Sequence, residues 1–156
     1  MNHAEVNPKN KTVFVQRHFN ATCQKIYRAW TDPMELQKWF GPEGVVTSVA
    51  IVDLRVGGQY RISMKSPNGE TVDHYGEYRE IIPNEKLIFT WLLDGQLCEG
   101  TKGEYAETLV TVEFKSVGAG TEVSLTHQYI PSETFRECYE DGWNGSFKCL
   151  ERVLQG

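Results

Sequence analysis

Short segments in which apolar and polar residues alternate fill the middle of the chain. Side chains of a β-strand point alternately to its two faces, so this alternation is typical of a sheet with one buried face. Pro67-Asn68-Gly69 is a strong hairpin signal, because asparagine and glycine tolerate the positive φ of a tight turn. The pattern predicts an antiparallel series of about seven strands, at residues 12–19, 45–53, 59–65, 71–82, 86–93, 108–116 and 121–129.

Two short helices are expected directly after the first strand. Asn20 and Thr22 are both good N-caps for the first of them. This helix is expected to end at Asp32, because the residue before a proline avoids helical angles. Pro33 can then open a second helix over residues 33–40, which ends at a Gly-Pro pair. The chain therefore begins with one strand followed by two brief helices.

The chain ends in one long amphipathic helix. Thr134 and Glu137 match the capping-box pattern and predict a start near residues 132–134. Apolar side chains then recur at helical spacing, while charged and amide side chains occupy the other face. About 23 residues span roughly 34 Å at 1.5 Å per residue, enough to cross a sheet of six or seven strands.

Small residues form a notch along one flank of this helix's buried stripe. They are Cys138, Gly142, Gly145, Ser146 and Cys149. Two glycines inside a helix cost on the order of 1 kcal/mol each relative to alanine, so something must offset them. Either the helix backbone crosses the sheet closely, which glycine permits, or the notch is the roof of an enclosed pocket. The sequence leaves both explanations open.

The length, the net charge and the absence of long apolar runs exclude several classes of protein. The chain has 156 residues, which predicts a single domain over 12–156 after a flexible tail at 1–11. The net charge of −5, without a basic run, argues against nucleic acid or an acidic membrane surface as a partner. No apolar run approaches 18 residues and the N-terminus lacks an apolar signal region, so we expect no membrane insertion and a cytoplasmic location.

The cysteines favour the same compartment. In a chain without an export signal, Cys23, Cys98, Cys138 and Cys149 are interpreted as reduced structural thiols. None forms a C-x-x-C pair. Cys138 and Cys149 would lie about 16 Å apart along one helix, too far to form a disulfide.

Several stretches, in their order and spacing, resemble one family over about residues 12–154. They are Phe19–Thr22, Ile26–Pro33, Trp39–Pro42, Asp53–Arg61, Gly76–Pro83, Leu87–Trp91, His127 and Gly142-Trp143. The chain is identified as a member of the SRPBCC family named after the activator of the 90-kDa heat-shock protein's ATPase, within the START-like superfamily. The resemblance implies an α+β helix-grip fold, in which a curved antiparallel sheet of about six or seven strands wraps a long C-terminal helix. It also implies a hydrophobic cavity between them. Some branches of this superfamily transport lipids or sterols, and others cyclise polyketides.

Beyond the fold, the sequence shows no set of residues that is typical of an active site. Asp73 and His74 point to opposite faces if residues 71–82 form a strand. His127 lies on the face expected to be buried, where a lone histidine is more often a satisfied core residue than a ligand contact. It is still the best polar anchor for a mostly apolar pocket. Metal-ligand and phosphate-loop motifs are absent, so we expect no catalytic residue, no metal and no cofactor.

The sequence therefore favours a non-catalytic protein that binds a small apolar or aromatic molecule. The residues expected to bind it are Tyr60, Met64, Trp91, His127, Tyr139, Trp143 and Phe147. A polyketide cyclase or aromatase-like enzyme is an alternative, which a strongly shifted pKa on His127 or a pocket tyrosine would favour. A module that contacts a chaperone ATPase is a second alternative, which an exposed apolar patch would favour.

Residues 94–106 are expected to be a mobile flap or a functional edge.

Overall fold

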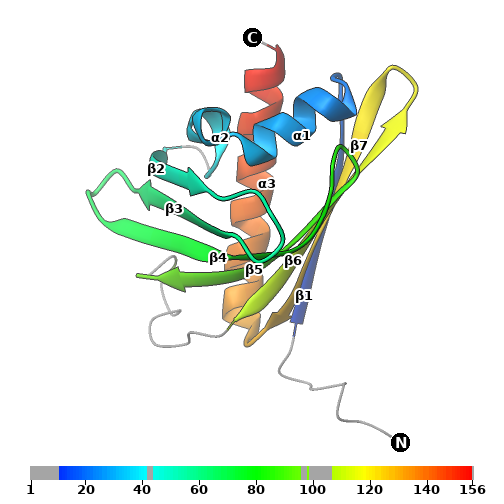
Figure 1. The fold of residues 1–156 in the computed structure, drawn as a ribbon. Coiled ribbons are helices and arrows are strands. Elements are labelled where there is room, and N and C mark those ends of the chain that lie inside the picture. Colours follow the sequence, from blue (N-terminus) through cyan, green and yellow to red (C-terminus); the bar gives the residue numbers. More distant parts are fainter. Residues whose placement is uncertain (1–10, 42–43, 96–97, 99–106, 156) are drawn as a thin grey trace, which may run out of the picture.

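The fold is described from a computed structural model, which covers residues 11–41, 44–95, 98 and 107–155. One antiparallel sheet has the strand order β1-β7-β6-β5-β4-β3-β2, and three helices accompany it (Figure 1). The elements in chain order are β1 (Lys11–Phe19), α1 (Cys23–Thr31), α2 (Pro33–Trp39), β2 (Val46–Val52), β3 (Gln59–Lys65), β4 (Thr71–Ile82), β5 (Lys86–Asp94), β6 (Thr108–Val117), β7 (Gly120–Ile130) and α3 (Glu133–Gln155). This arrangement confirms the predicted helix-grip fold.

The predicted strands agree closely with the observed ones. Residues 59–65 and 71–82 form β3 and β4 with the expected bounds. The other strands differ by one residue, at one end in β1, β5 and β6 and at both ends in β2 and β7. The sheet order follows the chain order from β2 to β7, because each of these strands pairs with the next. Only β1 pairs out of sequence, with β7, which brings the two ends of the strand series to one edge.

Side-chain caps set the helix boundaries. Of the two expected caps, Thr22 is the one that caps α1, and its hydroxyl accepts a hydrogen bond from the backbone N–H of Lys25 at 3.1 Å. α3 begins within the predicted range, but the expected capping box does not supply its cap. Instead, the hydroxyl of Ser132 accepts a hydrogen bond from the backbone N–H of Phe135 at 3.2 Å.

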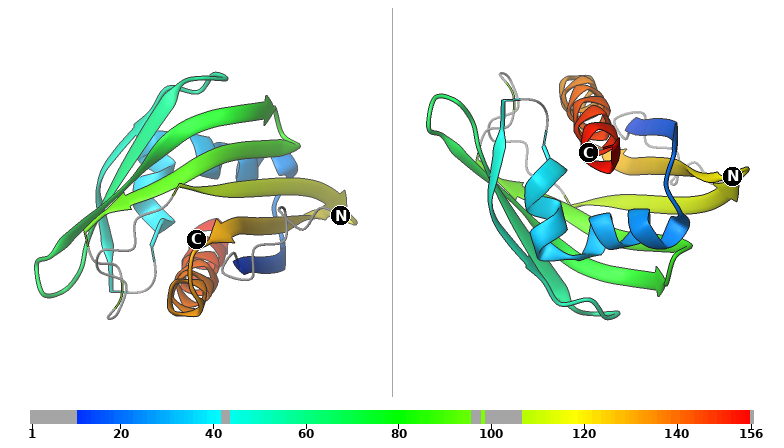
Figure 2. Two further views of the ribbon diagram at one scale, coloured as in Figure 1. Left: turned by 90° about the horizontal axis from the view of Figure 1, so that it is seen from below. Right: turned by 90° about the horizontal axis from the view of Figure 1, so that it is seen from above.

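The long helix lies inside the curve of the sheet but not equally close to every strand (Figure 2). The α3 backbone approaches β1 and β7 closely, and it also meets α2. Among the described residues, it makes no comparable approach to β3, β4 or β5. The sheet and helix therefore pack tightly at one side and stand apart at the other.

Aromatic side chains fill the tightly packed side beneath α1 and α2. Phe147 lies 5.8 Å from Phe19 and 6.1 Å from Trp30, measured between ring centroids. The Trp39 indole N–H donates a hydrogen bond of 2.8 Å to the carbonyl oxygen of Ala29, which ties α2 to α1. This closed end fixes α3 and so determines the width of the gap opposite β3–β5.

Some predictions fall outside the described residues. The tail and most of the 94–106 segment are among them, so the tail, the single domain over 12–156 and the flap stay predictions. β1 begins at Lys11, one residue before the expected boundary. In the described part of the chain, no helix is long and apolar enough to cross a membrane. The cytoplasmic location stays a prediction.

Candidate functional site

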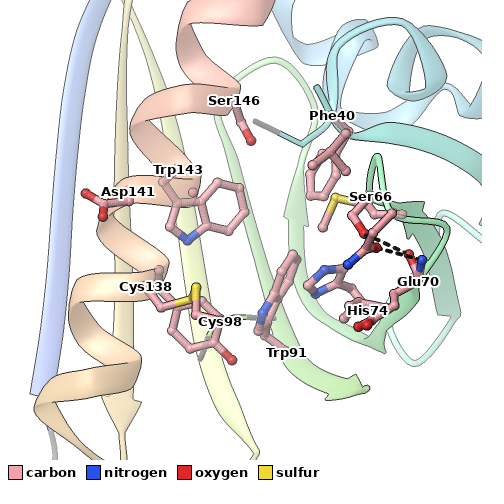
Figure 3. Close-up of a pocket in the computed structure, with 16 residues that line it drawn as sticks. Phe40, Ser66, Glu70, His74, Trp91, Cys98, Cys138, Asp141, Trp143 and Ser146 are labelled. Atoms are coloured by element: carbon pink, nitrogen blue, oxygen red, sulfur yellow. Dashed lines mark hydrogen bonds between the residues drawn. A yellow bond between two sulfur atoms is a disulfide. The ribbon is translucent and has the colours of Figure 1, made fainter. Parts of the chain in front are cut away.

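A cavity of about 660 Å³ occupies the gap between α3 and the strands β3–β5 (Figure 3). Its lining combines an apolar interior with polar residues of the β3–β4 hairpin. The described residues that line it are Phe40, Val45, Met64, Ser66, Asn68, Glu70, Val72, His74, Trp91, Cys98, Cys138, Tyr139, Asp141, Gly142, Trp143 and Ser146. The position matches the side of the fold where helix and sheet stand apart.

Three aromatic rings form a rigid wall of the cavity. The centroids of Trp91 on β5 and Trp143 on α3 lie 5.1 Å apart. Phe40 lies 5.8 Å from Trp143, edge to face, and 6.0 Å from Trp91. Because each ring contacts the other two, none can rotate freely, and the wall keeps its shape without a ligand.

Gly142 decides between the two explanations of the small-residue notch. A Cβ atom built on Gly142 would meet no atom within 4 Å, so this part of the helix faces open space rather than a strand. Ser146 and Cys138 line the same cavity. Close backbone approach does occur in α3, toward β1 and β7, but Gly142 is part of the cavity roof.

Ser146 also fixes the segment that follows α2. Its hydroxyl accepts a hydrogen bond of 3.1 Å from the backbone N–H of Gly41. Gly41 has a φ of +101°, and a Cβ there would lie 2.8 Å from the Met64 sulfur. The positive φ favours glycine here, because residues with a Cβ rarely adopt it, whereas the flexible Met64 side chain could move away from a Cβ.

His127 belongs to a hydrogen-bond chain behind the wall, and it does not line the cavity. The Trp143 indole can only donate, so its 3.1 Å bond to His127 Nδ1 places the imidazole proton on Nε2. Nε2 then donates to the Thr108 hydroxyl at 2.7 Å, and that hydroxyl donates to the Trp91 carbonyl oxygen at 2.9 Å. Both ring nitrogens are satisfied, so His127 orients the wall as a core residue.

The other expected binding residues divide into two groups. Met64, Trp91, Tyr139 and Trp143 line the cavity. Tyr60 and Phe147, like His127, do not line it. The Tyr60 hydroxyl donates a hydrogen bond to the carbonyl oxygen of Thr90 on β5. Phe147 packs against Phe19 and Trp30 on the tightly packed side of the fold. Whether the four lining residues bind a ligand stays a prediction.

His74 is a buried polar residue of the cavity lining that was not expected from the sequence. Its side chain is 1% exposed, and neither Nδ1 nor Nε2 has a hydrogen-bond partner among the described residues. The imidazole lies 4.6 Å from the Trp91 ring, measured between centroids. Asp73 points to the opposite face, as predicted, and binds Arg61 and Ser63 there. The alternation along β4, which buries Val72 and His74 together, was the available signal.

Burial governs the protonation of both buried histidines. It lowers the pKa of His74 to about 3 and the pKa of His127 to about 3, so both imidazoles are neutral near pH 7. Burial also raises the pKa of Tyr139. A strongly shifted pKa on His127 or a pocket tyrosine was expected to favour a catalytic role. Here the main cause is burial, and His127 is already paired with Trp143 and Thr108, so these shifts do not indicate an acid–base centre.

These histidines make stability depend on pH. A folded pKa depressed below the unfolded value of about 6.5 means that the unfolded chain binds protons which the folded chain excludes. Stability is therefore fully present above pH 6.5 and is lost progressively as the pH falls toward 3. Between pH 7 and pH 6 we expect the free energy of unfolding to fall by about 1 kcal/mol for the two groups together. Urea unfolding at the two pH values measures this. His74→Leu is expected to halve the decrease, and an undiminished decrease in this variant would contradict the assignment.

The structure corrects the prediction that all four cysteines are reduced. Cys98 and Cys138 form a disulfide beside the cavity, with their Cα atoms 6.1 Å apart (Figure 3). Cys23 and Cys149 are free thiols. The sequence shows no sign of this pairing, because 40 residues separate the two cysteines and only the tertiary fold brings them together.

Thiol labelling checks the disulfide. When the protein is unfolded without a reductant, we expect iodoacetamide to modify Cys23 and Cys149 and to leave Cys98 and Cys138 unmodified. Prior reduction should expose all four. Peptide mass spectrometry identifies the modified positions, and modification of Cys138 in the unreduced sample would contradict the disulfide.

Within the described residues, no group of three or more His, Cys, Asp or Glu could hold a metal ion. The arrangement does contain an apolar wall, an open helix roof and one unpaired buried imidazole. Such an arrangement can enclose a flat apolar molecule and orient it through a single polar contact.

A curved antiparallel sheet, a long C-terminal helix and a cavity between them define a helix-grip protein of the START-like class. The family described as activator of Hsp90 ATPase homolog 1-like protein matches residues 20–155. The chain belongs to this family.

Solved structures give the same fold. Protein CV1439 from Chromobacterium violaceum is 28% identical, with a TM-score of 0.78 over 94% of this chain and 99% of that one. The AHSA1 protein SPO3351 from Silicibacter pomeroyi is 20% identical, with a TM-score of 0.79 over 93% and 98%. CalU16 from Micromonospora echinospora is 20% identical, with a TM-score of 0.70 over 93% and 76%. No curated protein matches the chain significantly.

Proposed function

We propose that the protein binds a small hydrophobic or aromatic molecule in the cavity between α3 and β3–β5, without chemistry of its own. The observation that carries this proposal is the open space at Gly142, which lines the same cavity as a wall of aromatic rings. A volume of about 660 Å³ lies within the usual range of small-molecule sites, roughly 300–1,000 Å³.

Burial of apolar surface would drive the binding. Transfer of apolar surface from water is favourable by roughly 25 cal/mol per Å², before the cost of ordering the ligand. Trp91, Trp143 and Phe40 are already held in place by one another, so little side-chain entropy is lost when a ligand enters. A preformed wall of this kind favours flat molecules.

Native mass spectrometry of the purified protein, followed by denaturing extraction, tests the proposal. We expect a discrete additional mass that is released on denaturation, and its identity gives the ligand class. The apo protein is then titrated with naphthalene-sized aromatic probes. A clean apo mass together with no saturable probe binding would contradict the proposal.

Contact with a chaperone ATPase is a second candidate, which the family's description favours. Apolar side chains of the edge strand β2 are exposed, including Val49 at 40% and Ile51 at 57%. Such side chains on an unpaired sheet edge suit a protein partner. The test is the ATPase rate of a 90-kDa heat-shock protein with and without this chain. A rate that the chain leaves unchanged would reject this candidate.

A further inference from the structure

His74 is buried at the edge of the aromatic wall with both ring nitrogens unpaired among the described residues. A neutral imidazole offers one donor and one acceptor, and buried groups of this kind are nearly always hydrogen-bonded. Leaving them unpaired destabilises the protein that carries them. His127, which is equally buried, has both nitrogens paired, so the fold is able to satisfy a histidine and does not do so at residue 74.

The groups around the His74 side chain show where a hydrogen-bond partner could come from. Its ring lies beside Trp91, on the side of Trp91 away from Trp143, and it lines the cavity (Figure 3). The neighbouring strands hold Ile62 and Leu93 opposite it in register, and neither side chain can form a hydrogen bond. The described residues therefore supply no partner for the imidazole, and the cavity that His74 lines is a space in which a ligand can supply one.

The charges at the cavity disfavour an acidic ligand. No lysine or arginine is among its described lining residues. Glu70 lies at the hairpin, and the Asp141 carboxylate points away from the aromatic wall (Figure 3). A ligand carboxylate would therefore lose water without gaining a cationic partner, which is strongly unfavourable. His74 supplies no charge either, because burial lowers its pKa to about 3.

We propose that His74 is the polar anchor of the site, which holds the hydroxyl group of a flat, uncharged aromatic ligand. This inference rests on the proposed function and names its ligand class. A hydroxyl can both donate and accept, so it pairs with either nitrogen of the neutral imidazole. The aromatic part of the ligand lies along Trp91 and Trp143, while its hydroxyl ends at His74.

A pair of probes of matched shape tests the inference. 2-Naphthol carries the hydroxyl and 2-methylnaphthalene replaces it with a methyl group. Both are titrated into the wild-type protein and into His74→Leu, with quenching of tryptophan fluorescence as the readout. We expect the variant to bind 2-naphthol about tenfold more weakly, the worth of one buried hydrogen bond, and 2-methylnaphthalene as well as the wild type does. 2-Naphthoate should bind the wild type more weakly than 2-naphthol.

A stability measurement separates an anchor from a structural residue. Removing two unpaired buried nitrogens should raise the melting temperature of the unliganded His74→Leu protein by about 2–4 °C. A histidine that supports the fold would instead lower it. Tyr75→Phe, on the outer face of the same strand, is the matched control and should change neither probe affinity.

The outcomes distinguish the two proposals. If both probes bind and His74→Leu weakens them equally or not at all, the anchor is wrong and the cavity proposal stands. If neither probe binds the wild type, both proposals are contradicted. If the variant does not fold, ¹⁵N NMR of the wild-type His74 ring replaces it. A shift of Nδ1 or Nε2 with 2-naphthol, and none with 2-methylnaphthalene, supports the anchor, and identical shifts overturn it.

Discussion

Replacing Gly142 with leucine is expected to abolish ligand binding in the cavity while the protein stays folded. A Cβ at this position meets nothing within 4 Å, so the leucine side chain extends into the cavity volume rather than into packed atoms. Leucine also has a better helix propensity than glycine by somewhat under 1 kcal/mol, which opposes any loss of stability. We expect the affinity for 2-naphthol to fall about a hundredfold or more, since the leucine and the ligand would compete for one space. Calorimetric titration measures this.

Two controls make the result at Gly142 specific. Gly142→Ala adds only the Cβ and is expected to stabilise the protein by about 1 kcal/mol, with little change in affinity. Asn144→Leu places the same side chain on the exposed face of α3 and should leave binding intact. Wild-type affinity in a well-folded Gly142→Leu protein would contradict the cavity as the binding site. An unfolded variant would indicate that Gly142 is a backbone crossing instead.

Trp143→Ala is expected to lower the free energy of unfolding by about 3–5 kcal/mol. The side chain is 4% exposed and lies against Trp91, Trp30 and Phe40, with centroid distances of 5.1, 6.0 and 5.8 Å. Removing it leaves a large cavity in the wall and takes away the indole that donates to His127. Urea denaturation measures the change in the free energy of unfolding, and a loss below about 1 kcal/mol would contradict the packing of Trp143 against these three rings.

Trp143→Phe distinguishes the contribution of aromatic packing to stability from the contribution of the hydrogen bond to His127. Phenylalanine keeps most of the buried aromatic surface but cannot donate to His127 Nδ1, which then lies buried without a partner. The expected loss is about 1–3 kcal/mol, smaller than for alanine. If the two variants lose equal stability, the hydrogen bond rather than the packing is the larger contribution of Trp143.

The sequence by itself determined the elements of the fold and their order. Alternation in segments such as 59–65 and 71–82 predicts the strands within a residue, because the side-chain period of a strand is a local property of the backbone. The N-cap at Thr22 could be predicted for the same reason, since a cap involves residues three apart. The family, too, followed from motifs whose order and spacing lie along the chain.

The candidate site could be predicted only in part. Periodicity places a side chain on the buried face but does not show what lies opposite it. Trp91 and Trp143 line the cavity. His127, which was expected to be its polar anchor, lies behind the wall, and His74, for which no role was expected, lines the cavity. Partners distant in sequence satisfy His127, namely Thr108 and Trp143, whereas the strands beside His74 carry only apolar side chains in register with it.

The tertiary structure alone decided where helix and sheet separate. The small-residue notch on α3 is compatible with a close approach of the helix backbone to the sheet and with the roof of a cavity. A pattern of glycines shows only that large side chains are absent, and it does not show what lies opposite them. The packing of α3 against β1 and β7 leaves β3–β5 at a distance, and Gly142 falls on that side. The pairing of Cys98 with Cys138 was decided in the same way, since folding brings together residues that are 40 apart in the chain. Local pattern thus determined the elements, and long-range packing determined the cavity.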